Sequence, residues 1–271
     1  MLNQSIVTAK WLKKNLANPD LIILDSSVGT NQSNLNVKHP GEQIPGARFF
    51  DFKMVFSDQG HSVPNMMPSA DLFTKGAQNL GINSSSIIIV YDNLGVYTSP
   101  RAWWMFKTMG HHNVAVLDGG LNEWKILGYR TEPLSKKRLY NKGNFKTEFN
   151  PKQIVDVSQI KQNIISEQAI LVDARSEDRF NGKVPEPREG MKSGHIPKSV
   201  NLPYKLVLEG YCFRNKSELR VIFDHINPEK KPLFFTCGSG ITACIILLAS
   251  SLVNKGPKSL YDGSWSEWGT I

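Results

Sequence analysis

The chain has 271 residues, 40% of them hydrophobic, and a formal net charge of +8. This length allows one large core or two cores of ordinary size, because single domains commonly run to about 100 to 200 residues. No run approaches the roughly 18 apolar residues that cross a bilayer, and the start lacks the apolar segment of a secretory signal. We therefore expect a soluble protein of the cytoplasm.

Basic residues are spread along the chain, apart from the run KKR at 136–138. Scattered charge of this kind favours solubility and the capture of small anions. Binding to nucleic acid would need a clustered basic surface with aromatic side chains for the bases, and the segment around KKR barely supplies them. We expect neither nucleic acid nor a membrane as a partner.

Short apolar runs that alternate with amphipathic stretches predict an α/β fold. In the first half, residues 21–28 (LIILDSSV) and 86–91 (SIIIVY) predict buried strands, and SPRAWWMFKTMG from Ser99 predicts a helix. Runs that are apolar throughout are typical of parallel strands, which are covered on both faces. We expect a mainly parallel sheet flanked by helices in each half of the chain.

The second half repeats the first. LIILDSSV at 21–28 returns as AILVDARS at 169–176, and IIIVYDNLG from Ile87 returns as PLFFTCGSG from Pro232. A period of roughly 145 to 150 residues indicates a duplicated domain rather than a solenoid. The segment between the halves is polar, basic and without period, which suits a linker. The predicted divisions are a first domain at 1–131, a linker at 132–152 and a second domain at 153–271.

Cys237 lies between the apolar run LFF and the helical pattern ITACIILLASSLVNK. It is therefore expected at the carboxyl end of a strand, where open parallel sheets bind ligands. Gly238 and Gly240 can take positive φ, so the turn can present its amides to an anion, aided by the positive end of the helix dipole. Such a site favours the thiolate, which makes Cys237 a predicted nucleophile. The predicted anion loop consists of Gly238, Ser239, Gly240, Ile241 and Thr242.

Three cysteines are too few and too oddly spaced for a disulfide framework or a zinc site, so we expect free thiols, a reducing compartment and no metal. Cys244 falls on an apolar helix face and is expected to fill space, whereas Cys212 gives no signal. A buried Cys237 could also be a small hydrophobic residue. The two glycines and two hydroxyls that follow it favour the nucleophile.

A cradled thiolate could cleave phosphate esters or transfer sulfur. Cysteine phosphatases place an arginine six residues after the cysteine to grip the phosphate, and that position here is Ala243. Without the guanidinium the loop is poorly equipped for a dianionic phosphoryl group. Sulfur transfer, in which the thiolate holds a sulfane sulfur as a persulfide, needs no metal or other cofactor and is favoured.

Four motifs resemble those of the two-domain rhodanese family, the thiosulfate and 3-mercaptopyruvate sulfurtransferases: DARSEDRF from Asp173, PEPREGMKSGHIPKSVNLP from Pro185, CGSGITAC from Cys237 and YDGSWSEWG from Tyr261. The resemblance covers nearly the whole chain. It implies two tandem rhodanese-like domains, with the persulfide cysteine in the second. Asp92 stands at the equivalent place in the first, so that domain is expected to be catalytically silent.

Within this family, Gly-Ser-Gly after the cysteine is typical of the mercaptopyruvate branch, whereas basic residues there are typical of the thiosulfate branch. The resemblance implies that Arg179 and Arg188 hold the carboxylate and carbonyl of the donor. Two converging guanidiniums suit an α-keto acid because they form charge-assisted hydrogen bonds with it. Asp173 is expected to give structural support, which agrees with the common use of such an aspartate in a turn or cap.

Mercaptopyruvate enzymes of the family have been assigned an aspartate and a histidine that work with the loop serine in proton transfer. Lys53 and Asn65 occupy those places here, although His61 lies four residues before Asn65. Ser239 keeps its place as a donor in the loop. A weakened relay would favour thiosulfate or slow the reaction with mercaptopyruvate, because the departing enolate needs a proton.

The sequence thus predicts a sulfurtransferase that moves sulfane sulfur from 3-mercaptopyruvate or thiosulfate to cyanide or a thiol by ping-pong chemistry. Thioredoxin, glutathione and sulfite are further candidate acceptors. Two alternatives stay open. One is a thiosulfate:cyanide sulfurtransferase with little mercaptopyruvate activity, and the other is a persulfide carrier for a protein partner.

Overall fold

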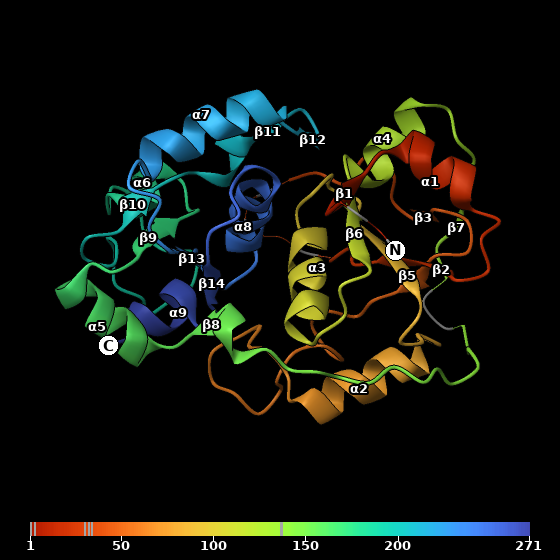
Figure 1. The fold of residues 1–271 in the computed structure, drawn as a ribbon, viewed down its shortest axis with the longest axis horizontal. Coiled ribbons are helices and arrows are strands. Elements are labelled where there is room, and N and C mark those ends of the chain that lie inside the picture. Colours follow the sequence, from red (N-terminus) through yellow and green to blue (C-terminus); the bar gives the residue numbers. More distant parts are fainter. Residues whose placement is uncertain (1, 3, 30, 32, 34, 136–137) are drawn as a thin grey trace. The chain divides into compact units, whose positions relative to one another are not determined.

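The computed structural model describes residues 1–271 apart from 1, 3, 30, 32, 34, 136 and 137 (Figure 1). The run KKR at 136–138 therefore lies partly outside the described residues. The chain divides into two compact units, and each takes a short segment from the other's half of the sequence. The first unit consists of Met1–Asp58, Met67–Asn150 and Gly210–Phe213, and the second of Gln59–Met66, Pro151–Glu209 and Arg214–Ile271.

The first unit is built on a parallel sheet. Its five strands, counted over the described residues, lie in the order β1-β6-β5-β2-β4. Strand β5 is central and almost wholly buried because Ile and Val side chains fit a strand covered on both faces. β3 and β7 form a separate antiparallel pair. The strand bounds are β1 Ile6–Val7, β2 Leu21–Asp25, β3 Glu42–Gln43, β4 Arg48–Phe49, β5 Ile87–Tyr91, β6 Val114–Leu117, β7 Glu132–Pro133 and β12 Cys212–Phe213.

Helices cover both faces of this sheet (Figure 1). Leu12 of α1 and Trp124 of α4 belong to one core cluster, together with residues of β2, β5 and β6. On the other side, Phe73 of α2 meets Phe106 of α3 edge to face, with ring centroids 5.1 Å apart. The helix bounds are α1 Ala9–Asn15, α2 Ala70–Asn79, α3 Ser99–Thr108 and α4 Gly120–Ile126.

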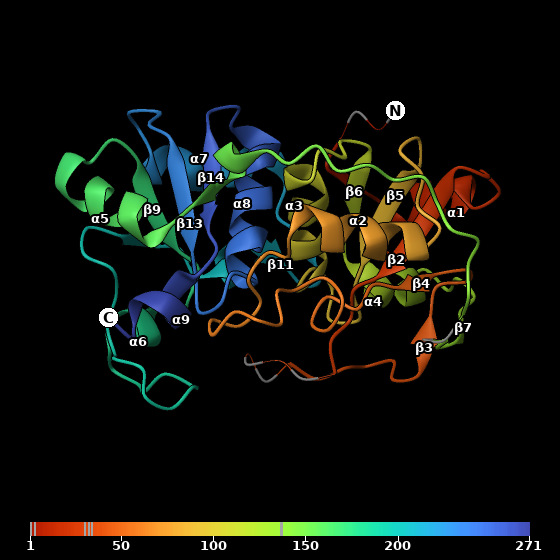
Figure 2. The same cartoon turned by 90° about the horizontal axis from the view of Figure 1, so that it is seen from below.

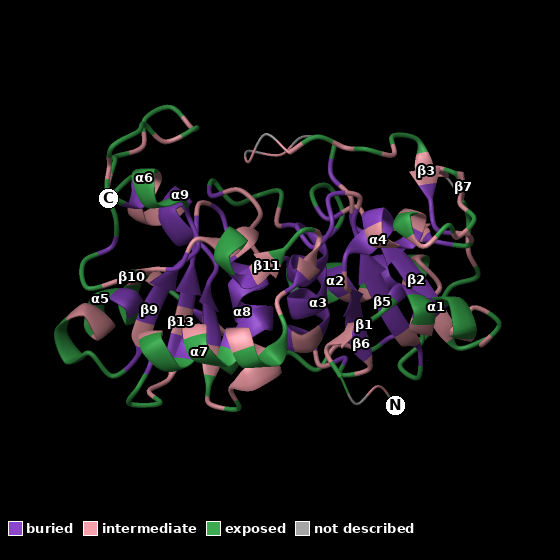
Figure 3. Ribbon diagram, turned by 90° about the horizontal axis from the view of Figure 1, so that it is seen from above, coloured by how far each residue is buried: buried purple, intermediate pink, exposed green. Residues whose placement is uncertain are grey.

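The second unit repeats this design. Within the described residues its five-stranded parallel sheet has the order β10-β9-β13-β14-β8. Figure 3 shows its strands mostly buried, as their apolar sequences predict. The strand bounds are β8 Ile154–Val155, β9 Ile170–Asp173, β10 Val200–Asn201, β11 Leu208–Glu209, β13 Leu233–Thr236 and β14 Lys258–Tyr261.

Helices also lie on both faces of the second sheet, which Figures 1 and 2 show from two directions. Ile160 of α5 and Trp265 of α9 share a core cluster with strand residues such as Leu171. Helix α8 packs on β13 and β14 from the other side and also contacts α7. The helix bounds are η1 Pro151–Gln153, α5 Val157–Ser166, α6 Glu177–Phe180, η2 Tyr204–Val207, α7 Lys216–Ile226, α8 Thr242–Val253 and α9 Ser264–Trp268.

The two sheets match strand for strand. Reading the second sheet from β8 gives β8-β14-β13-β9-β10, which pairs each strand in turn with β1-β6-β5-β2-β4. The predicted α/β fold with two tandem, mainly parallel sheets is therefore confirmed. The segment after α4 is part of the first unit as far as Asn150. No helix among the described residues is long and apolar enough to cross a membrane.

Candidate active site

Cys237 directly follows β13, the middle strand of the second sheet, and precedes α8. It therefore lies at the carboxyl edge of the sheet, as its sequence context predicts. The residue is 1% exposed. Its backbone is held on both sides, because its carbonyl accepts a hydrogen bond from Trp265 N at 2.9 Å and its amide donates one to Ser264 Oγ at 3.3 Å.

The loop after the cysteine has all its carbonyls engaged. Each carbonyl oxygen from Cys237 to Ile241 accepts a hydrogen bond. In a trans peptide unit the N–H points away from the C=O, so the amides of 238–242 point away from these donors. Gly240, with φ +75°, makes the turn that this arrangement requires. In loop order the donors are Trp265 N, Ser266 N and Oγ, Asn65 Nδ2, Cys244 Sγ and Cys244 N.

Ser264 adopts a conformation that side chains rarely tolerate. Its φ is +51°, its side chain is fully buried, and its hydroxyl donates to Tyr261 O at 2.8 Å while accepting from Cys237 N. The matching residue of the first unit is Gly120, with φ +54°. A left-handed non-glycine residue is kept where the surroundings enforce it, often near a functional group.

Arg179 comes from α6 and reaches the start of the cysteine loop. A Cβ atom built on Gly238 would lie 3.0 Å from Arg179 Nη2, so the guanidinium closely approaches that backbone. Glu186 holds it from the other side, with Oε1 accepting from Nε at 3.1 Å and Oε2 accepting from Nη2 at 2.5 Å. Burial lowers the pKa of Arg179, but the bonds and charge of Glu186 outweigh burial, and the Cys237 sulfur adds to the upward shift.

Arg188 approaches the loop through a serine. Its Nη1 donates to Ser266 Oγ, and that hydroxyl donates to Gly238 O at 2.6 Å. Burial lowers the pKa of Arg188, and the nearby Cys237 sulfur opposes that shift. Both predicted donor arginines therefore lie close enough to the predicted nucleophile to interact with its sulfur electrostatically. The structure brings the two residues to one end of the second sheet with Cys237.

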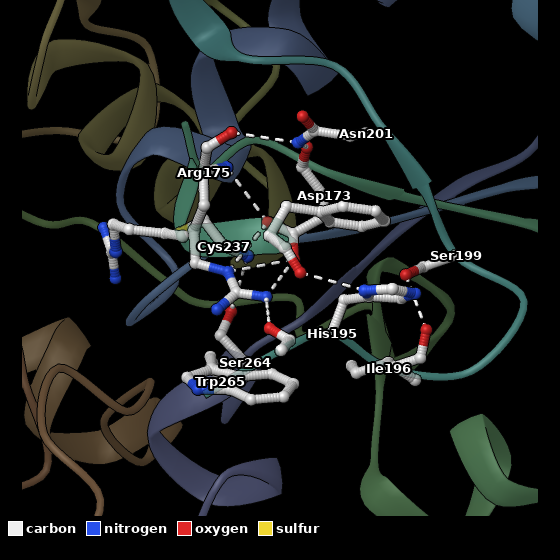
Figure 4. Close-up of polar contacts among 12 residues, drawn as sticks. Asp173, Arg175, His195, Ile196, Ser199, Asn201, Cys237, Ser264 and Trp265 are labelled. Atoms are coloured by element: carbon white, nitrogen blue, oxygen red, sulfur yellow. Dashed lines mark hydrogen bonds and ion pairs between the residues drawn. The ribbon is translucent and has the colours of Figure 1, made fainter. Parts of the chain in front are cut away.

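Asp173 is part of a buried ion-pair network at the end of β9 (Figure 4). Its Oδ1 accepts from Arg175 N at 2.9 Å, and Oδ2 accepts from Arg175 Nη2 at 2.7 Å. The Arg175 guanidinium lies over the Trp265 ring, 4.2 Å from its centroid, and also donates to Glu186 Oε1 at 2.9 Å. Both the Arg175 and Asp173 side chains are almost completely buried. Through the contact of Arg175 with Trp265, the network connects the carboxyl end of β9 to α9, the helix that follows β14.

The segment 59–66, which belongs to the second unit, supplies one contact to the cysteine loop. Asn65 Nδ2 donates to Ser239 O at 3.4 Å. Asn65, at the position that the resemblance matches to a histidine of mercaptopyruvate enzymes, thus lies against the loop. His61 is exposed, and its Nδ1 accepts from Val63 N at 3.0 Å. An amide cannot carry a proton between groups as an imidazole does.

The first unit offers an internal comparison for the loop. Asp92 follows β5 just as Cys237 follows β13, and its carboxylate is fully buried. Oδ1 accepts from Leu94 N at 2.9 Å. Oδ2 accepts from three amides and a hydroxyl: Tyr97 N at 2.8 Å, Thr98 N at 3.0 Å, Ser99 N at 2.9 Å and Ser99 Oγ at 2.7 Å. The turn at this place in the duplicated fold therefore encloses an anion.

The other two cysteines have different surroundings. Cys244 is buried in α8, and its thiol donates to Gly240 O at 3.3 Å. Cys212 lies in the first unit, where burial raises the pKa of its thiol to about 12 and the carboxylates of Asp118 and Glu123 add to the shift. Such a thiol stays protonated at neutral pH and is a poor nucleophile. Among the described residues no cluster of His, Cys, Asp or Glu could hold a metal ion.

Four residues at this site escaped the sequence analysis: Arg175, Glu186, Ser264 and Ser266. Two of them leave a signal in the sequence. Glu186 stands between the two predicted arginines in RFNGKVPEPR, and a carboxylate there suggests an ion pair. Ser264 replaces a glycine when YDGSW is aligned with LDGGL, which suggests positive φ.

Comparison with known proteins gives the same class. The family described as "Rhodanese-like domain" matches residues 8–127 and 156–270. The 3-mercaptopyruvate sulfurtransferase of Escherichia coli K12 is 37% identical over 269 residues, covering 97% of this chain and 94% of that protein. The thiosulfate sulfurtransferase of Rattus norvegicus is 36% identical over 287 residues, covering 99% of this chain and 93% of that protein.

A solved structure agrees with the sequence relatives. The crystal structure of SseA from E. coli, described as a 3-mercaptopyruvate sulfotransferase with the rhodanese fold, aligns with a TM-score of 0.85 and 33% identity. The alignment covers 98% of this chain and all of that one. The chain belongs to the rhodanese family, with two rhodanese domains. It is an enzyme of the sulfurtransferase class, as the resemblance of its motifs implied.

Proposed function

We propose that this enzyme transfers a sulfane sulfur from 3-mercaptopyruvate or thiosulfate to a thiophilic acceptor through a persulfide on Cys237. One observation carries the proposal. In the duplicated fold, the residue equivalent to Cys237 is Asp92, whose carboxylate accepts hydrogen bonds from four backbone amides. A turn that holds an anion at this place suits a thiolate, and also the persulfide anion that follows it.

The first half-reaction forms the persulfide. The Cys237 thiolate attacks the outer sulfur of the donor, a new S–S bond forms, and the bond between that sulfur and the rest of the donor breaks with its electron pair. When thiosulfate is the donor, the leaving group is sulfite. When 3-mercaptopyruvate is the donor, the leaving group is the enolate of pyruvate. The carbon of this enolate takes up the proton that the donor thiol gives up. The persulfide then rests against the amides of 238–242 and the positive end of α8.

The second half-reaction returns the free thiolate. An acceptor attacks the outer sulfur of the persulfide, and the S–S bond breaks with its electron pair going to the Cys237 sulfur. Cyanide would leave as thiocyanate, and a thiol such as thioredoxin or glutathione would leave as its own persulfide. The scheme is ping-pong and uses the covalent persulfide in place of a cofactor. We propose the cytoplasm as its compartment, because none of the three cysteines forms a disulfide in the described structure.

The donor is proposed to bind between Arg179 and Arg188. Both guanidiniums lie beside the loop and interact electrostatically with Cys237. They can hold the carboxylate and carbonyl of an α-keto acid by charge-assisted hydrogen bonds and so direct its sulfur at Cys237. Asp173 supports the site indirectly, since it fixes Arg175, which in turn holds Glu186.

The preferred donor depends on proton transfer. Gly-Ser-Gly after the cysteine favours mercaptopyruvate, but Asn65 at the loop supplies an amide rather than an imidazole. The mercaptopyruvate reaction, which must protonate a carbon, is therefore expected to be slower than its loop sequence suggests. Thiosulfate needs no such proton, so thiosulfate:cyanide activity is the second candidate function.

Turnover and mass spectrometry test the proposal. We expect the native enzyme, incubated with either donor and no acceptor, to gain one sulfur atom on Cys237. Cys237→Ser should abolish cyanide-dependent turnover with both donors, while Cys212→Ser, the control, should retain it. Arg188→Ala should harm mercaptopyruvate turnover more than thiosulfate turnover. Sulfur found on another residue, or turnover without Cys237, would refute the mechanism, and persulfide without any small-molecule turnover would favour a carrier.

A further inference from the structure

Glu186 is the one carboxylate that contacts both Arg175 and Arg179 in the described structure. We propose that it is a positioning residue for sulfur transfer: it fixes the Arg179 guanidinium at the cysteine loop and neutralises it, so that Arg188 is the cation that attracts the donor. The inference rests on the proposed function of Cys237 and assigns a role to a residue that its motif alone does not explain.

The contacts define the orientation of Arg179. The Glu186 side chain is 2% exposed, and its two oxygens take Nε and Nη2 of Arg179 in a fork-to-fork pair. Such a pair fixes the plane of the guanidinium as well as its position. The third contact, from Arg175 Nη1, anchors Glu186 to a side chain that is itself completely buried. Arg179 thus has a rigid support on the side away from Gly238.

The Arg179 guanidinium also lies close to the backbone of the cysteine loop. Arg179 Nη2 occupies the space where a side chain on Gly238 would begin, 3.0 Å from the Cβ position. The hydrogens of Arg179 that Glu186 does not use are those of Nη1 and the second one of Nη2. Because the plane is fixed, these hydrogens point in set directions beside the loop. Loss of Glu186 would let the guanidinium turn and would misplace the donor's reacting sulfur relative to Cys237.

The charges of Arg179 and Arg188 are compensated to different degrees by neighbouring groups. Arg175 and Arg179 carry two positive charges, and Asp173 and Glu186 carry two negative charges, so the four together are neutral. Arg188 is hydrogen-bonded instead to the neutral hydroxyl of Ser266, and the charge of Glu186 acts on it less than that of Cys237 or Arg179. Its charge is therefore less compensated than that of Arg179 and is the main one available to an anionic donor.

Three variants separate geometry from charge. Glu186→Asp keeps the charge but shortens the reach, and Glu186→Gln keeps the length but leaves the network with one extra positive charge. Glu189→Gln makes the same chemical change three residues along, at an exposed position, and serves as the control. The measurements are kcat and KM with thiosulfate and with 3-mercaptopyruvate, and the pH dependence of Cys237 alkylation by iodoacetamide, a neutral probe of the thiolate.

We expect kcat to fall roughly tenfold to a hundredfold in both Glu186 variants, because the reacting atoms are misaligned, with KM changed much less. The alkylation profile should move to lower pH in Glu186→Gln, since added positive charge favours the thiolate, and stay unchanged in Glu186→Asp and Glu189→Gln. If Glu186→Gln does not fold, Glu186→Asp still decides the geometric part through kcat.

Two results would overturn the inference. One is a kcat within twofold of wild type in Glu186→Asp. The other is a Glu186→Gln variant that folds and whose alkylation profile matches wild type. Failure of the proposed function looks different, because the native enzyme itself would then form no persulfide on Cys237. A stability loss with unchanged kcat would assign Glu186 a purely structural role.

Discussion

Replacement of Asp92 by alanine tests the idea that this turn of the duplicated fold is built around an anion. The substitution removes a buried carboxylate that accepts five hydrogen bonds and lies at the start of α3. A buried donor left without an acceptor costs about 1 to 3 kcal/mol, although water can replace part of the loss. If water serves all but two of the donors, the loss is about 4 kcal/mol.

Asparagine at position 92 gives an intermediate case. Its oxygen can replace Oδ2 and keep most of the bonds, but its NH₂ group would face Leu94 N, which is also a donor. We expect a loss of about 2 kcal/mol for Asp92→Asn. Asp20→Ala, which removes an exposed aspartate of the same unit, is the control and should stay within about 0.5 kcal/mol of wild type.

Urea unfolding followed by tryptophan fluorescence measures these differences. Trp103 and Trp104 lie on α3, directly after the turn, and report on the first unit. The order of midpoints should be wild type, then Asp92→Asn, then Asp92→Ala, with similar slopes. A loss below about 1 kcal/mol in Asp92→Ala would show that the amides do not depend on this anion, and the comparison that supports Cys237 would fail.

Two further predictions concern strain and pH. Ser264→Gly should be more stable than Ser264→Ala by about 1 kcal/mol in thermal or urea unfolding. Both variants lose the hydroxyl, but only alanine has a side chain that is strained in the left-handed backbone conformation at φ +51°. Equal stability of the two variants would contradict this prediction. Burial raises the pKa of Asp118 to about 6, so this group favours the folded state below its unfolded pKa near 4, and that contribution is lost as pH rises through 6. Asp118→Asn should therefore gain about 3 kcal/mol relative to wild type at pH 8 and little at pH 4, provided that Phe213 N keeps its acceptor. A gain of the same size at both pH values would refute the assignment.

The sequence by itself determined the fold class and the place of the predicted nucleophile. Runs such as Ile87–Tyr91 are apolar at every position, and only a strand covered on both faces buries them all, so the parallel sheets follow from local pattern. The repeat of these runs predicted two matching sheets. The change from the apolar run to Cys237, glycine and a helical period put the cysteine at a strand end, where the structure has it.

Only the tertiary structure decided which side chains meet at that strand end. Arg188 and Ser266 are 78 residues apart, and Ser264 reaches the Cys237 amide across 27 residues. Periodicity describes neighbours along one helix or strand, and it carries no information about hydrogen-bond partners that come from separate loops. Glu186 shows the same limit at short range: its charge is visible in the sequence, but its burial between two arginines depends on the fold around it.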